Sequence, residues 1–146
     1  MATPKKVIRE KFPNLGVTDF KVTSPDTPAY NCIAWAAGND TRFWWPAHDG
    51  FWPEGIPREE SLDAFKAAFA ALAYQPCADG AFDALLEKVA IYVDAGGKPT
   101  HAARQLESGR WTSKLGQFHD IEHKTTHGVE GAVYGKVGLY MSRPRA

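Results

Sequence analysis

The chain has 146 residues, of which 44% are hydrophobic and 12% aromatic, so residues 1–146 are predicted to fold as one domain with a substantial core. Its 17 basic and 17 acidic residues give a formal net charge of zero, which argues against nucleic acid or a membrane surface as a partner. No apolar run reaches the ~20 residues that span a bilayer, and no apolar stretch follows the basic N-terminus. The sequence therefore predicts a cytoplasmic protein without a signal peptide, with export by another route left open.

The first half of the chain is predicted to be mainly helical. Residues 7–12 suit a short charged helix, and residues 17–22 alternate weakly, as an edge strand does. Residues 58–73 are the clearest helix, because their apolar positions fall on one stripe. Those positions are Leu62, Phe65, Phe69 and Leu72. We therefore expect the first half to supply the helical layer of the domain.

The second half is predicted to form a small antiparallel sheet. The expected strands are residues 89–93, 100–106, 111–116 and 137–141. Residues 119–123 are polar and are expected to form a loop, while residues 128–134 suit a short helix. The order of the elements predicts an α+β domain in which a helix-rich first half packs on this sheet.

Residues 30–38 contain the most suggestive chemistry in the chain. Cys32 stands at the start of a short apolar run that Gly38 closes, and Asn31 is a good N-cap residue. A thiol in the first turn of a helix lies near the positive end of the helix dipole, which favours the thiolate. The alternative is a small buried hydrophobe, which free cysteines commonly are. Cys77 falls in a predicted turn and is the poorer candidate for a nucleophile.

A nucleophilic thiol needs a base, and a third group has to orient that base. Only His101, of the five histidines, begins a predicted central strand directly after a tight turn. A cysteine early in the chain and a histidine on a later strand follow the order of papain-like enzymes. His119, His123 and His127 crowd a polar segment whose spacing matches no standard metal site, so we expect no metal and no other cofactor.

Two resemblances support this interpretation. Residues 88–103 resemble the strand–turn–strand of the NlpC-type cell-wall peptidases, a branch of the papain-like fold. In that family the principal histidine precedes the first of these strands, where this chain has Lys88, and His101 matches a later polar position. The resemblance implies a papain-like, NlpC-like fold in which either His101 has taken the role of the base, with an acid from elsewhere, or NlpC-type catalysis has been lost.

Nearly the whole chain is also similar to a bacterial domain family without an established function. The shared signature comprises residues 30–36, 44–46, 52–53, 101–103, 111–116 and 120–123. This resemblance is specific in sequence, but it implies no activity.

The papain-like layout places the orienting group after the third strand, where Asp120 is the nearest carboxylate. Glu122 and the hydroxyl of Ser113 are the rivals, because the strand register is uncertain by about two residues. The oxyanion donors would be the backbone N–H of Cys32 and the side chain of Asn31.

The remaining candidates for substrate binding lie in a proline-punctuated aromatic loop. Trp44, Trp45 and Trp52 either cap one end of the core or form a wall beside Cys32 that holds a peptide. Ser113 is expected to be within reach of the same substrate.

The sequence thus predicts a cysteine peptidase or amidase with Cys32 as nucleophile, His101 as general base and Asp120 as orienting group. Its partner would be a peptide or protein substrate, and an inhibitor protein is a further option. Two alternatives stay open: a catalytically silent module that binds a peptide or protein, and a deamidase or transglutaminase-like effector. Hydrolysis and transfer share a thioester intermediate and differ only in what attacks it.

Overall fold

The computed structural model describes residues 3–16, 20–47, 50–115 and 118–145. Its helices are α1 (Pro4–Lys11), α2 (Cys32–Ala36) and α3 (Leu62–Ala70), with a 3-10 helix η1 (Thr126–Val129). Its strands are β1 (Phe20–Val22), β2 (Gln75–Cys77), β3 (Leu86–Val93), β4 (Pro99–Gln105), β5 (Trp111–Lys114), β6 (Asp120–His123) and β7 (Lys136–Pro144).

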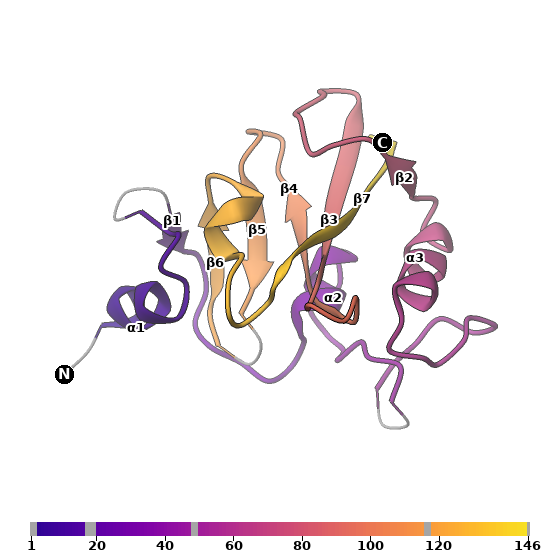
Figure 1. Ribbon diagram of the computed structural model, residues 1–146, viewed down its shortest axis with the longest axis horizontal. Helices are drawn as coiled ribbons and strands as arrows, with labels where there is room; N and C mark the ends of the chain where they lie inside the picture. Colours follow the sequence, from indigo (N-terminus) through magenta and orange to yellow (C-terminus); the bar gives the residue numbers. More distant parts are fainter. Residues whose placement is uncertain (1–2, 17–19, 48–49, 116–117, 146) are drawn as a thin grey trace.

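One antiparallel sheet dominates the molecule (Figure 1). Its seven strands lie in the order β1-β6-β5-β4-β3-β7-β2, so β1 and β2 form its edges. The prediction of a papain-like α+β domain, with a helix-rich first half packed on a small sheet, is therefore wrong. The helices in the described ranges are few and short, and the first half contributes β1 to one edge of a large sheet.

Strand β6 is the main reason for this error, because its Asp-Ile-Glu-His sequence was expected to form a loop. The polar side chains alternate along the strand, with Ile121 and His123 on one face and Asp120 and Glu122 on the other. Each carboxylate has a partner that makes a strand position tolerable: the Tyr30 hydroxyl binds Asp120, and arginine and lysine side chains bind Glu122.

Strand β2 was also missed, since Gln75–Cys77 was expected to be a turn. It pairs with β7 at the end of the sheet. Pro76 has no N–H to donate to a second neighbour, so an edge is the position that such a strand can occupy.

The sheet separates two hydrophobic clusters. On one face, which we call the α2 face, α2 and α3 pack on Val89, Ile91 and Ala102. On the other, which we call the α1 face, α1 and η1 pack around Tyr92 and Ala103. Neighbouring residues of one strand, such as Ala102 and Ala103, thus belong to different cores.

Both predicted helices that flank the tryptophan loop are present. Asn31 caps α2, because its Oδ1 accepts the N–H of Ala34 at 3.2 Å. Ser61 caps α3 by accepting the N–H of Ala64 at 3.2 Å, so the helix starts later than the predicted residue 58. Four apolar residues of α3 are buried on the α2 face of the sheet: Ala64, Phe65, Ala68 and Phe69.

Candidate active site

Cys32 is the first residue of α2, as predicted, but its thiol is not activated in this structure. The residue is 6% exposed and belongs to the core on the α2 face. Burial raises the pKa of Cys32 to about 11, although the backbone N–H groups of Ala102, Ile33 and Cys32 itself act to lower it. The expected preference for thiolate is therefore wrong for the resting state. A helix of five residues offers too little dipole to offset the loss of hydration.

His101 lies on β4, with its ring on the α1 face. The residue is fully buried, and its ring stacks on that of Tyr134 with centroids 4.0 Å apart and an interplanar angle of 7°. Its Nε2 is 3.0 Å from the Oγ of Ser113 on β5. Burial, and secondarily the charge of His123, holds the pKa of His101 well below its usual value, so the imidazole is neutral at pH 7.

A chain of hydrogen bonds fixes the proton positions around Ser113. The Nδ1 of His123 is 2.8 Å from the carbonyl oxygen of Thr125, which can only accept, so Nδ1 carries the proton. The Nε2 of His123 therefore accepts from the Ser113 hydroxyl at 2.8 Å. Ser113 in turn accepts from the Nε2–H of His101. We assign the tautomer of His101 on this basis, with Nδ1 unprotonated and buried without a hydrogen-bond partner.

Cys32 and the His101 ring lie on opposite faces of the sheet, because the thiol belongs to the core on the α2 face and the ring stacks on Tyr134 on the α1 face. The pKa of Tyr134 is raised by burial and further by charge on Cys32, and the N–H of Ala102, the residue after His101, acts on the thiol. No hydrogen bond joins the Cys32 sulfur to His101 within the part of the chain that the structure describes.

Asp120 is directed to other partners. Its Oδ2 accepts from the Tyr30 hydroxyl at 2.6 Å, and its backbone N–H donates to the Ser24 hydroxyl at 3.2 Å. Lys114 stands opposite Asp120 across the β5–β6 pair, so both face α2, whereas Ser113 faces the α1 side. The structure thus brings Ser113, and not Asp120, to His101.

Glu122, the other rival orienting group, is bound elsewhere. Its Oε2 accepts from Arg110 at 2.8 Å and is 3.7 Å from the ammonium of Lys21.

Lys114 is a buried cation on the α2 face, beside Asp120 and Tyr30. Lys114 donates to the carbonyl of Phe118 and lies 5.2 Å from the ring centroid of Tyr30. Burial lowers the pKa of Lys114, while the carboxylate of Asp120 raises it.

The side chain of Asn31, predicted to be an oxyanion donor, makes structural hydrogen bonds instead. Besides capping α2, its Oδ1 accepts the N–H of Trp44 at 2.9 Å, and its Nδ2 donates to the Trp44 carbonyl at 2.6 Å. The side-chain amide is therefore committed to holding the tryptophan loop against the helix. Trp45 and Trp52 pack against Phe65 of α3, with ring centroids 5.4 and 5.0 Å away. The structure thus places the predicted aromatic wall in the core, with only Trp45 partly exposed.

The sequence analysis did not identify two residues of this site, His123 and Tyr134. His123 completes the hydrogen-bond chain, and the period-2 alternation of residues 120–123 is the signal that would have placed it on the face of Ser113. Tyr134 covers His101 from the segment between η1 and β7. A single aromatic residue in a loop carries no pattern that predicts this contact.

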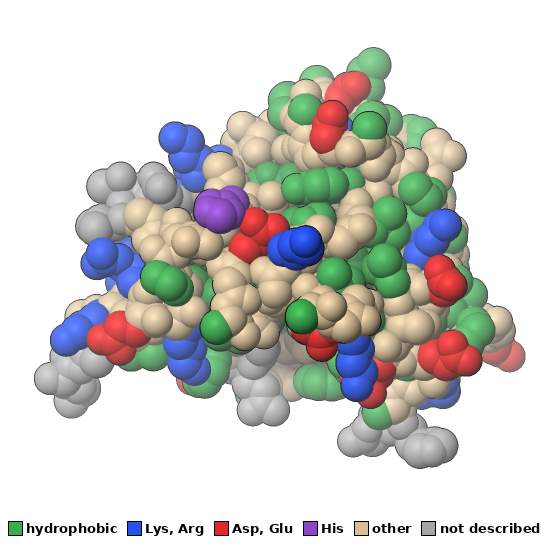
Figure 2. Space-filling view, in the orientation of Figure 1, with side chains coloured by type: hydrophobic (Ala, Val, Ile, Leu, Met, Phe, Trp, Pro, Cys, Tyr) green, Lys and Arg blue, Asp and Glu red, His purple; other side chains and the backbone are tan. Residues whose placement is uncertain are grey.

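Neither positive nor negative charge dominates the face of the molecule shown in Figure 2. Figure 2 shows basic and acidic side chains interspersed over the face that it presents. Among the described residues, no group of three or more His, Cys, Asp or Glu side chains is arranged to hold a metal ion. None of the helices in the described ranges is long and apolar enough to cross a bilayer.

Comparison with known proteins identifies the family. Residues 21–142 match the model of a family described as "Domain of unknown function (DUF7689)", and the chain belongs to that family. Searches of curated proteins and of solved structures give no match. The matched range contains Cys32, His101 and Ser113, whereas α1 lies outside it.

Proposed function

We propose that the protein is a cysteine-dependent enzyme that cleaves an amide or peptide bond. Cys32 is the nucleophile, Nδ1 of His101 is the general base, and Ser113 is a positioning residue that holds the imidazole in the useful tautomer. One observation supports this proposal above all: the hydrogen-bond chain leaves Nδ1 of His101 as a buried proton acceptor without a partner, in a ring that stacks on Tyr134, whose pKa is raised by burial and by the charge of Cys32.

The proposed step begins with a neutral pair. As the Cys32 sulfur attacks the substrate carbonyl carbon, its proton passes to Nδ1 of His101, and the imidazolium that forms keeps its Nε2–H bond to Ser113. His101 then gives the proton to the departing amine as the C–N bond breaks, which leaves a thioester on Cys32. Attack of water on the thioester releases the acid, and attack of an amine would give transfer.

The burial of both groups sets a condition on this chemistry. Cys32 is 6% exposed and His101 0%, and the two side chains face opposite sides of the sheet. The chain around them must therefore move before a carbonyl carbon can reach the thiol and the thiol proton can reach Nδ1. Both cysteines are free thiols, which suits the reducing cytoplasm that we propose as its compartment.

The second candidate is a catalytically silent module that binds a peptide or protein. The enclosed thiol, with its pKa raised to about 11, favours this alternative. In such a module Cys32 is a small core residue, and its replacement by alanine leaves function unchanged.

An acylation assay separates the two without knowledge of the natural substrate. We expect p-nitrophenyl acetate to acetylate Cys32, with release of p-nitrophenol, and mass spectrometry of the digested protein locates the acetyl group. The Cys77→Ala variant should keep the full rate. Cys32→Ala and His101→Ala should each lower it by about 10²-fold or more, and the double variant should be little slower, because both residues serve one step.

Circular dichroism verifies that each variant is folded. An acetyl group found only on Cys77 or on lysines, at a rate that His101→Ala does not change, would contradict the enzyme proposal and favour the binding module.

A further inference from the structure

We propose that the protein has a second binding site, which takes a small monocarboxylate with an apolar body of about five or six carbon atoms. The site is a cavity of about 180 Å³ between α1 and the described residues Leu115, Phe118 and His119. It is separate from Cys32 and His101, neither of which lines it. Its existence does not depend on the proposed enzymatic activity.

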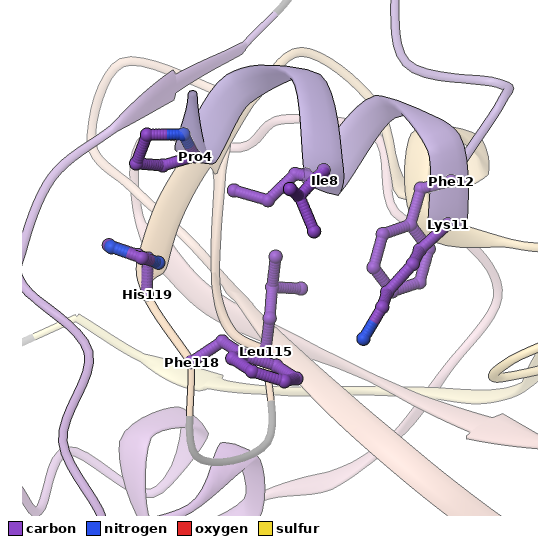
Figure 3. A pocket seen from close by; sticks show the side chains of 8 residues that line it. Pro4, Ile8, Lys11, Phe12, Leu115, Phe118 and His119 are labelled. Atoms are coloured by element: carbon purple, nitrogen blue, oxygen red, sulfur yellow. The ribbon is translucent and has the colours of Figure 1, made fainter. Parts of the chain in front are cut away.

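The walls of the cavity are apolar on both sides. Val7, Ile8 and Phe12 come from α1 and its C-cap, while Leu115 and Phe118 come from the opposite segment. Figure 3 shows the side chains of Ile8 and Leu115 directed toward one another across the space. An apolar space of ~150 Å³ in a protein is large enough to accept a six-carbon ring such as benzene. The size of this cavity therefore suits a ring or a short chain of the same size.

The rim of the cavity carries positive charge and a hydrogen-bond donor. Figure 3 places Lys11 and His119 on opposite sides of the space. The Lys11 ammonium lies 4.2 Å from the ring centroid of Phe118, and no carboxylate pairs with it in the described part of the chain. No acidic side chain is among the described residues that line the cavity. A carboxylate on the ligand would pair with this exposed ammonium, while the apolar body fills the interior.

The cavity is open to a ligand from solvent. Val7 is 38% exposed and Phe118 50% exposed, although both are apolar and line the space. A bound apolar group would cover these surfaces and remove them from water, which is favourable. Because α1 lies outside residues 21–142, the site is formed by a segment of this chain that packs on the family fold.

Titration with hexanoate, followed by amide shifts in ¹H–¹⁵N spectra, tests the proposal. We expect saturable shifts at residues of α1 and around Leu115. Acetate should bind at least about tenfold more weakly, because it leaves the cavity empty. Hexan-1-ol should bind about threefold more weakly than hexanoate, because it cannot pair with Lys11. The Lys11→Met variant should lose this preference for the acid, and Lys6→Met, which removes a charge from an exposed residue outside the cavity, should keep it.

A cavity-filling variant tests the location. Val7→Phe adds a ring at the partly exposed mouth and should weaken hexanoate binding by about tenfold or more, whereas Val133→Phe, at an exposed position outside the cavity, should not. Shifts that fail to saturate would show a packing void only. Equal affinity in the wild type and Val7→Phe would place the ligand elsewhere, and equal affinity for hexanoate and hexan-1-ol would remove the role of the charge. Each of these results overturns the proposal.

Discussion

Replacement of Phe65 by alanine is expected to lower the free energy of unfolding by about 3–5 kcal/mol. Phe65 is fully buried in α3, and its ring contacts those of Trp45 and Trp52 at centroid distances of 5.4 and 5.0 Å. Removal of the ring leaves a cavity at the point where the tryptophan loop meets the helix, and two large rings cannot collapse into it without strain. Urea denaturation of both proteins measures the difference.

Phe43→Ala is the matched control, because Phe43 is 44% exposed. Its cost should be under about 1 kcal/mol. A loss of the same size for both variants would show that the tryptophan loop does not pack on α3 as the structure has it.

Stability is expected to fall by about 3 kcal/mol as the pH drops from about 6.5 to about 4, through His123 alone. Burial lowers the pKa of His123 to about 4, whereas the unfolded chain takes up the proton near the usual value of 6.5. Below pH 6.5 the unfolded state therefore binds more protons than the folded state, so acid favours unfolding. The contribution is fully present above pH 6.5. Burial lowers the pKa of His101 as well, which adds in the same direction.

Denaturation curves between pH 7 and pH 4 for two histidine variants isolate this effect. His123→Gln should flatten the pH dependence, while His127→Gln, at a side chain that is 71% exposed, should leave it as in the wild type. An unchanged slope in His123→Gln would show that the buried histidine is not the source.

The sequence predicted the parts of the fold that local patterns determine. The N-cap at Asn31 and the strands around Ile91 and Ala102 are present close to the expected positions, because capping chemistry and apolar runs are local signals. The extent of the sheet was not predictable in the same way. Strand β6 depends on Tyr30, which is 90 residues from Asp120, and no local pattern reveals a partner at that separation.

In the candidate site, too, local patterns predict some features, while others depend on strand register. Residue type and position predicted the elements that carry Cys32 and His101, which the structure places on α2 and β4, but the third group depends on strand register. Ser113 pairs with Ile121 and Lys114 with Asp120, so Ser113 and Asp120 lie on opposite faces of the sheet. A shift of one residue exchanges these faces, and the sequence defines the register only to about two residues.

The most direct test of the proposed site is the tautomer of His101. Long-range ¹H–¹⁵N correlation at pH 7 reports which ring nitrogen carries the proton. We expect a neutral imidazole with Nε2 protonated and Nδ1 unprotonated, because Ser113 accepts from Nε2 and the His123–Thr125 pair fixes the direction of the chain. A ring protonated at Nδ1, or at both nitrogens, would leave Cys32 without a proton acceptor and would contradict the proposed mechanism.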